Sequence, residues 1–249
     1  MASNQNKITE KMLSVYKPVG LTPLQTLNLL REKYPAYKDE KLTYAGRLDP
    51  LAEGVMLVVV GEEVKNKEVY LGLDKEYEAE ILFGVATDTG DVLGIPSISR
   101  SNLDIEGDDL ANLLPNFVGK FVQEYPKFSS PKIAGKDNFS KEVEIKSLEL
   151  VAVSKIKTAD LQIGIEMKIA GVDGDFRQSE ILPAWAEFFA INKQPDFMIA
   201  KIKIATGSGV YIRVLAEKLG AKLGVPALAY HILRNKVGNY PIDTSVKLD

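Results

Sequence analysis

The longest uninterrupted apolar run of the chain, residues 55–60, is the feature that most limits its fold. Six residues are far fewer than the ~20 needed to cross a membrane, so the run predicts a strand buried within a sheet. Residues 76–83 carry apolar side chains at every second position with three Glu between them, which indicates a strand with one face in solvent. A sheet that buries at least one face is therefore the core that this sequence favours.

The remaining patterns show how helices and strands follow one another. Thr22 can cap a helix that begins at Pro23, with Gln25 at the capping-box position. Strands come in pairs and runs with helices falling irregularly between them. This predicts an α+β fold with a mixed, mainly antiparallel central sheet flanked by helices, in a single domain over 12–242. Further strands are expected at 12–16, 143–153, 161–169, 198–205 and 227–232, and further helices at 109–117, 180–190 and 210–219.

The chain of 249 residues contains no Cys and a single His, His231. It therefore has no disulfide, no thiolate nucleophile and no Cys-ligated metal, and it cannot build a site from several histidines. If the protein is an enzyme, its tools are carboxylates, Tyr, Lys and Arg. We interpret His231 as a packed or surface residue. The N-terminal residues lack the apolar stretch of a signal peptide, so we expect a cytoplasmic protein.

The net charge of −3 conceals a polarised chain. Residues 74–110 hold ten acidic and two basic side chains, whereas residues 194–249 hold eight basic and four acidic ones. A local basic surface suits a polyanion such as RNA, because phosphate neutralisation supplies most of the non-specific affinity. Scattered solvated charges would give the same counts, so charge alone leaves both interpretations open.

One loop holds a charge in an unusual place: Asp49 lies between a Leu and a Pro, just ahead of the buried strand. An Asp that accepts hydrogen bonds within a turn would explain it without any function. Asp49 and Glu53 could also mimic the carboxylate pair of a glycosidase, although their spacing does not fix the separation that this mechanism needs. Two other short patterns, at 88–90 and 207–209, are better explained as turns than as protease or cofactor-binding motifs.

The segment GRLDPLAEG around Asp49 resembles the catalytic-loop motif of pseudouridine synthases. Four further stretches follow in the same order as in the tRNA pseudouridine(55) synthase (TruB) family, and the likeness extends over 12–242. They are YKPVGLTPLQ, DKEYEAEILFGVATDTGDVLG, YPKFSSPKIAGK, and GVYIRVLAEKLG followed by ALAYHILRNKVGNYPI. The resemblance implies the pseudouridine synthase catalytic fold, and the isomerisation of a tRNA uridine to pseudouridine without a metal or organic cofactor.

The resemblance also implies three catalytic residues. Asp49 would be the catalytic carboxylate, Tyr77 would lie against the target base and share in its proton transfer, and Arg213 would keep Asp49 ionised and aimed. A single carboxylate suffices, whether it attacks the sugar, attacks the base or removes a ribose proton, and the sequence does not choose among these routes. Taken without the resemblance, Tyr77 is a core residue and Arg213 a surface helix residue, although a cation in a first helical turn opposes the helix dipole.

Other residues would bind the substrate. Lys17 and Pro18 would help build the pocket wall, and Ile232 would occupy the apolar site beneath the base. Family members usually carry His-Thr-Gly-Ala before Leu-Asp-Pro, where this chain has the residues from Tyr44 to Arg47. The missing His normally helps hold the displaced nucleotide, so we expect Tyr44 to stack in its place, with Arg47 beside it.

The target uridine must leave its stack, which costs a few kcal/mol. Phosphate contacts from Lys127, Lys132 and Lys136 would offset this cost. These residues belong to an RNA-gripping insertion near 124–142 that looks shortened.

The chain stops soon after its last expected strand, so we expect no C-terminal RNA-binding domain, and weak, salt-sensitive RNA binding. The expected substrate is the T-loop uridine in the T arm of tRNA, and the expected enzyme is a monomer without membrane contact. The alternatives are another structured RNA as the substrate, or a catalytically idle RNA-binding or RNA-folding module.

Overall fold

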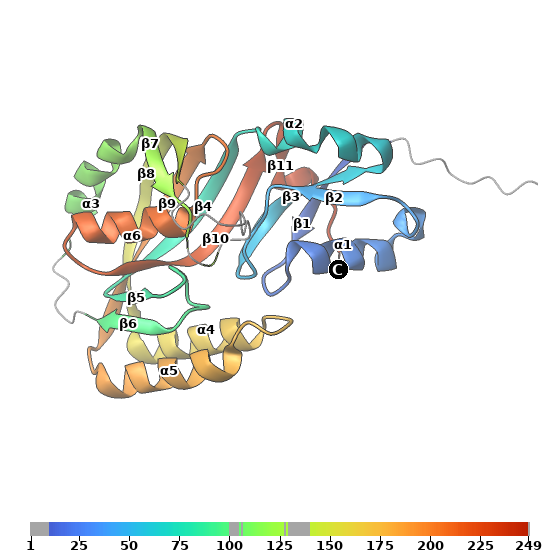
Figure 1. Ribbon diagram of the computed structural model, residues 1–249. Coiled ribbons are helices and arrows are strands. Elements are labelled where there is room, and N and C mark those ends of the chain that lie inside the picture. Colours follow the sequence, from blue (N-terminus) through green and yellow to red (C-terminus); the bar gives the residue numbers. More distant parts are fainter. Residues whose placement is uncertain (1–9, 100–104, 106, 127, 129–139, 249) are drawn as a thin grey trace, which may run out of the picture.

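The computed structural model describes residues 10–99, 105, 107–126, 128 and 140–248. A sheet runs through the middle of the molecule, and helices lie against both of its faces (Figure 1). The strands are β1 (Met12–Lys17), β2 (Leu42–Ala45), β3 (Ala52–Val60), β4 (Lys75–Phe83), β5 (Val85–Thr87), β6 (Pro96–Ser99), β7 (Gly119–Glu124), β8 (Ser140–Lys157), β9 (Asp196–Thr206), β10 (Ala227–Val237) and β11 (Tyr240–Pro241). The α-helices are α1 (Pro23–Lys33), α2 (Lys67–Leu71), α3 (Gly107–Leu113), α4 (Thr158–Ala170), α5 (Gln178–Ile191) and α6 (Ile212–Lys222), and short 3-10 helices are η1 (Pro35–Tyr37), η2 (Gly61–Asn66), η3 (Leu114–Phe117) and η4 (Ile242–Thr244).

The main sheet is mixed. Its strands follow the order β1-β3-β10-β4-β9-β8-β7, with β2 paired to β3 and β11 paired to β10. All of these strand pairs are antiparallel except β3 with β10, which run parallel. β5 and β6 form a separate two-stranded sheet. The predicted α+β class with a mixed, mainly antiparallel sheet is thus confirmed.

The two faces of the sheet bury different cores, because successive residues of a strand point in opposite directions. On β4, Tyr77 and Ala79 face the core that α6 covers, whereas Leu82 faces the core beneath α4 and α5. A third core lies between α1 and the β1–β3 end of the sheet. No helix in the described part of the chain is long and apolar enough to cross a membrane.

The start of α1 has the predicted capping box. The backbone N–H of Gln25 donates to Thr22 Oγ1 (3.2 Å), and the Gln25 side chain accepts from the backbone N–H of Thr22 (2.7 Å). Pro23 takes the first turn, where its missing N–H is not needed. Gln25 also donates to Asp173 Oδ2 (2.7 Å), so the same residue ties α1 to the α4–α5 connection.

One predicted strand is wrong, because residues 161–169 lie within helix α4. Every second side chain in this segment is apolar, which produced the strand prediction. In the structure every fourth residue from Leu161 is buried against α5 and the sheet, while Ile163 and Met167 are largely exposed. Packing against α5 therefore selects the helical period over the alternating one.

A glycine controls how closely β3 and β10 approach. Gly54 has φ +107°, and a Cβ there would collide with the backbone carbonyl of Arg234. Only glycine fits this conformation and this contact. The close approach brings the start of β3, where the loop of residues 46–51 ends, against β10.

Candidate active site

Asp49 lies in the loop between β2 and β3, and Arg213 lies in the first turn of α6. Arg213 Nε donates to Asp49 Oδ2 (2.8 Å) and Nη2 donates to Oδ1 (3.3 Å). This bidentate geometry fixes the direction of the carboxylate as well as its charge. The Arg213 side chain is 4% exposed and that of Asp49 is 35% exposed. The expected contact between these residues is therefore present, and it leaves the carboxylate accessible from outside.

A second carboxylate, Asp91, also faces Arg213. Its Oδ2 lies 3.7 Å from Arg213 Nε, and Arg213 Nη1 donates to the carbonyl of Thr89. Burial raises the pKa of Asp91 to about 6, with the neighbouring Asp49 adding to the rise and Arg213 opposing it. Burial would lower the pKa of Arg213, but Asp49 and Asp91 outweigh it and raise that pKa. Arg213 thus stays charged between two carboxylates.

Sequence reasoning missed Asp91. It interpreted residues 88–90 as a turn, which the structure bears out: Gly90 has φ +75° and the chain reverses there. The missed signal was the next residue, an acidic side chain between that Gly and the buried Val92 and Leu93. A charge placed directly before a buried pair needs a partner of opposite charge.

Two buried cations hold the Asp49 loop from below. Lys17 Nζ donates to the carbonyls of Pro18 (2.7 Å), Pro50 (3.2 Å) and Ala52 (2.6 Å). Burial lowers the pKa of Lys17 to about 7, although Asp49 and Glu53 oppose the change. The Lys17 side chain is fully buried. It therefore braces the end of the loop, and its role in the pocket wall stays a prediction.

The second of these cations, Arg234 on β10, was also missed. Its Nε donates to the carbonyl of Val55 (2.7 Å), and its Nη atoms donate to the carbonyls of Arg47 (3.1 Å) and Gly46 (3.2 Å). Burial lowers the pKa of Arg234, while its electrostatic interaction with the neighbouring Tyr77 opposes that change. Lys17 and Arg234 together satisfy carbonyls on both sides of Asp49, so the loop is rigidly seated.

Tyr77 and Ile232 lie close beneath the loop. Each is 8% exposed, and both belong to the core cluster that contains Leu48 and Ala52, the residues on either side of the Asp49 turn. Their strands β4 and β10 are paired, with Ile232 opposite Ala79. An aromatic ring and an aliphatic side chain thus form part of the apolar floor on the side of the sheet where Asp49 lies.

The other expected binding residues are more peripheral. Pro18 is partly exposed beside the loop. The Tyr44 ring on β2 faces two cations, Arg47 at 5.8 Å and Lys67 at 5.6 Å from its centroid. Arg47 is exposed. Lys132 lies outside the described residues, as do Lys127, Lys136 and most of the insertion expected near 124–142.

Glu53 points to the opposite side of the sheet from Ala52, its neighbour on β3. It accepts a hydrogen bond from the Tyr16 hydroxyl and pairs with His231 Nε2 at 2.8 Å. The hydrogen bond to His231 is the main cause that lowers the pKa of Glu53. The geometry does not support a glycosidase pair with Asp49. Within the described part of the chain, no three His, Asp or Glu side chains gather as metal ligands would.

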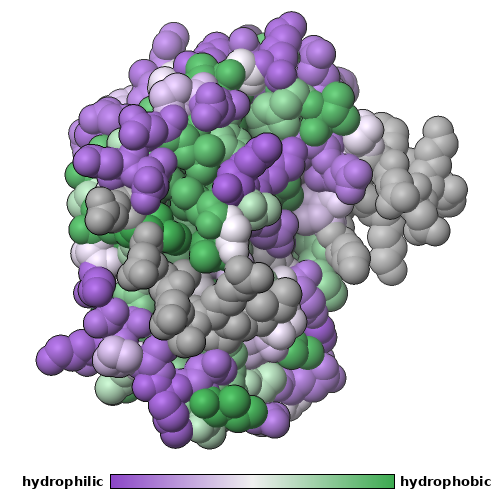
Figure 2. Space-filling view, turned by 90° about the vertical axis from the view of Figure 1, so that its left-hand side faces the viewer, coloured by the Kyte–Doolittle hydropathy of each residue, from purple (hydrophilic) through white to green (hydrophobic). Residues whose placement is uncertain are grey.

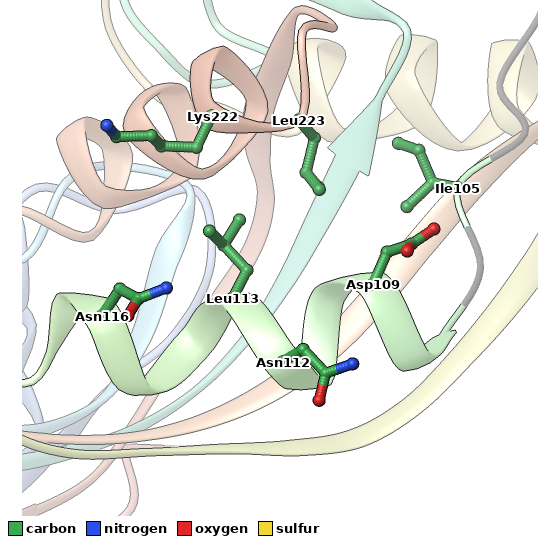
Figure 3. A pocket seen from close by; sticks show the side chains of 7 residues that line it. All are labelled: Ile105, Asp109, Asn112, Leu113, Asn116, Lys222 and Leu223. Carbon is green, nitrogen blue, oxygen red and sulfur yellow. The ribbon is translucent and has the colours of Figure 1, made fainter.

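Two cavities lie near the other end of α6 from Arg213. One of about 470 Å³ lies between α3 and the end of α6 and is lined by Ile105, Asp109, Asn112, Leu113, Asn116, Lys222 and Leu223 (Figure 3). The second, of about 550 Å³, adjoins it and is lined by residues of η3, β7 and α6. Figure 2 faces this side of the molecule and shows apolar residues gathered among polar ones. Neither cavity includes Asp49.

Comparisons with known proteins agree with this architecture. A family model described as TruB family pseudouridylate synthase (N terminal domain) matches residues 34–170. A tRNA pseudouridine synthase B of Staphylococcus aureus (strain bovine RF122 / ET3-1) is 30% identical over 242 residues, covering 96% of this chain and 70% of that protein. The protein of the same name from Aromatoleum aromaticum (strain DSM 19018 / LMG 30748 / EbN1) is 27% identical over 245 residues, covering 98% and 68%.

Among solved structures, a chain in the crystal structure of a Cbf5-Nop10-Gar1 complex superposes with a TM-score of 0.61 at 18% identity, covering 95% of this chain and 52% of that one. This chain therefore spans about half of the solved chain, and the likeness shows the fold alone. The fold is that of the pseudouridine synthases, a class of RNA-modifying isomerases. The family match and the relatives at 30% identity show that the chain belongs to the TruB family, as the resemblance indicated.

Proposed function

We propose that this enzyme converts a uridine in the T loop of tRNA to pseudouridine, with Asp49 as its catalytic carboxylate. The relatives named tRNA pseudouridine synthase B support tRNA as the substrate. The observation that carries the proposal is the bidentate clamp of Arg213 on a carboxylate that is still 35% exposed. A structural ion pair has no need of that exposure, whereas a group that meets a substrate does.

The reaction breaks the bond between N1 of uracil and C1′ of the ribose and forms a bond between C5 and C1′. The hydrogen on C5 is lost and N1 gains one, so no atoms are gained or lost overall. One ionised carboxylate serves this chemistry by attacking the sugar, attacking the base, or removing a ribose proton. Arg213 favours the ionised form of Asp49 and holds both of its oxygens in one direction.

The apolar floor beneath Asp49 receives the flipped base. Tyr77 and Ile232 are the side chains that contact the uracil, and the Tyr77 hydroxyl, which lies beside Arg234, takes part in proton transfer to or from the base. Replacing stacked neighbours with an aromatic ring is the usual way in which proteins hold an extruded base.

Substrate RNA approaches over the exposed side of the loop. Pro18, Tyr44 and Arg47 contact the RNA there, with the Tyr44 ring stacking on the displaced nucleotide in place of one of the cations that now face it. Lys132 and the rest of the insertion near 124–142 bind phosphates. The unit acts as a monomer over 12–242.

The test is to incubate the purified protein with a tRNA transcript and map pseudouridine by chemical labelling and primer extension. Release of tritium from [5-³H]uridine gives the rate, because the C5 hydrogen must leave. Product in the T loop supports the proposal, and product at another position of the transcript contradicts the T-loop assignment. Absence of product with retained tRNA binding contradicts it and favours an RNA-binding or RNA-folding module.

A further inference from the structure

We propose that the helical hairpin α4–α5 positions the catalytic arginine, by holding the loop of residues 88–95 through Trp185 and Arg177. The inference rests on the proposed function of the Asp49 site. Figure 1 shows the hairpin lying alongside β5 and β6, the two short strands that the loop connects. The hairpin covers the opposite side of the sheet from α6, which carries Arg213.

The 88–95 loop supplies two of the contacts of Arg213. The Thr89 carbonyl accepts from Arg213 Nη1, and the Asp91 carboxylate lies 3.7 Å from Nε. Internal hydrogen bonds make the loop stiff: Thr87 Oγ1 donates to the Asp91 carbonyl (2.6 Å), and the Leu93 N–H donates to Asp91 Oδ1 (3.0 Å). Any shift of this loop therefore moves the guanidinium that aims Asp49.

Trp185 of α5 fixes one end of the loop. Its side chain is fully buried, and its indole N–H is shared between the carbonyls of Val92 and Gly94, each at 3.1 Å. These carbonyls flank Leu93, whose N–H bonds the Asp91 carboxylate. One hydrogen-bonded chain thus runs from α5 through the loop to the carboxylate beside Arg213.

Arg177, at the start of α5, fixes the other end. It is the one non-glycine residue with positive φ (65°) among the residues that the structure describes, a conformation that strains a side chain with a Cβ. Its Nη1 pairs with Asp88 Oδ2 at 3.0 Å, and Asp88 Oδ1 accepts from the Ile95 N–H (2.8 Å). The guanidinium also lies over the Phe128 ring at 4.6 Å. The strained conformation is retained at a residue that clamps the loop.

Trp185→Phe is the first test, because it keeps an aromatic ring while it removes the indole N–H; the smaller ring also leaves a cavity, for which a core variant must control. The expected result is a loss of about tenfold in kcat, with KM for the tRNA transcript changed by less than about twofold. Phe197→Leu is the matched control. Phe197 is fully buried in the same core and its ring contacts Phe188 and Phe189, but its side chain has no group that could hydrogen-bond to the loop. It should lower Tm at least as much and leave kcat intact.

Arg177→Gly should lower kcat without lowering Tm, and this difference separates a positioning role from a role in stability. Glycine relieves the positive φ, so Tm should hold or rise, while the lost clamp on Asp88 should lower kcat by about threefold. Phe128→Leu controls for the ring contact of Arg177. Trp185 is the single Trp of the chain, so its fluorescence should shift to the red in Arg177→Gly if the loop loosens.

The outcomes are distinct. A wild-type protein that forms no pseudouridine refutes the proposed function. An active wild type whose Trp185→Phe and Arg177→Gly variants keep full kcat, or lose it only in proportion to Tm as Phe197→Leu does, overturns the positioning role. Lower kcat in both variants, with an unchanged KM and with Tm preserved in Arg177→Gly, supports it.

Discussion

Two carboxylates four residues apart, Asp49 and Glu53, meet opposite surroundings. Asp49 lies on the side of the sheet covered by α6, gripped by Arg213 through both oxygens and 35% exposed. Glu53 lies on the other side, with Tyr16 bonded to one oxygen and His231 to the other, and is 20% exposed. Arg213 holds the Asp49 carboxylate so that it stays accessible from outside, whereas Tyr16 and His231 occupy both oxygens of Glu53. Under the proposed function, the direction of pairing, more than the charge itself, separates the reactive carboxylate from the structural one.

Asp49→Asn should produce the largest effect. The amide keeps the shape of the side chain but supplies no charge, so turnover should fall by more than about 10³-fold, while Tm stays within about 2 °C. Tritium release measures the turnover, and a filter-binding assay measures tRNA affinity, which should be largely kept. Residual activity above a few per cent of wild type would contradict the role of Asp49.

Arg213→Lys should come next. Lysine retains the charge but cannot bond both Asp49 oxygens and the Thr89 carbonyl at once, so the carboxylate loses its direction. We expect kcat to fall by about 10- to 100-fold with KM little changed, measured on the same transcript. Lys236→Arg, at an exposed ion pair with Glu76, is the control and should be neutral. An Arg213→Lys enzyme with wild-type kcat would show that the orientation of the Asp49 carboxylate by Arg213 is unimportant.

Asp91 should make the pH–activity profile of the enzyme fall on its acid side, and we call this decline the acid limb. Its folded pKa of about 6 lies above the ordinary value of 3.8, so it protonates as the pH falls through 6 and releases part of its hold on Arg213. Activity should decline below about pH 6, and Asp91→Asn should flatten that limb.

Stability changes in the opposite direction, because a raised folded pKa contributes stability that is full below pH 3.8 and lost as the pH rises through 6.

Wild-type and Asp91→Asn melting curves recorded at pH 4 and pH 7 check this sign, since the difference between the two proteins cancels the other titrating groups. A limb that persists unchanged in Asp91→Asn would assign it to another residue.

Glu53→Gln should have the smallest effect on activity, within about twofold of wild type. Loss of the charge weakens the hydrogen bonds to Tyr16 and His231 and should lower the free energy of unfolding by about 1 kcal/mol, discounted for partial exposure. The pKa of Glu53 is lowered in the folded state, so this stability is present above its unfolded pKa and vanishes as the pH falls. Urea unfolding of the wild type and of Glu53→Gln at pH 7 and pH 3 tests this pH dependence of stability. A large loss of turnover in Glu53→Gln would contradict the structural role that distinguishes Glu53 from Asp49.

Local patterns predicted much of the fold. The capping box at Thr22 and Gln25 specified the start of α1 because its bonds involve neighbours in the chain. The alternation from 76 to 83 specified β4 because its Glu residues stay at least partly exposed while the residues between them are buried. In α4 the apolar pattern suited both periods, and only contact with α5 decided between them. β2 was not predicted, since its short sequence becomes a strand by pairing with β3.

The candidate site was predictable only in part. Asp49 stands out locally, and its pairing with Arg213 came from the resemblance, not from spacing. Asp91, Arg234 and Trp185 escaped because their importance arises from contacts between distant segments. Arg234, for example, bonds carbonyls 179 to 188 residues away. No pattern within a short window carries that information.

The parallel pairing of β3 with β10 has a consequence for biosynthesis. The Asp49 loop is synthesised well before β10, the strand whose Arg234 guanidinium anchors the loop carbonyls of Gly46 and Arg47. A nascent chain that has not yet released β10 has three backbone oxygens without their anchor and no seated carboxylate. The Asp49 loop therefore reaches its seated geometry only after β10 has been synthesised and has paired with β3.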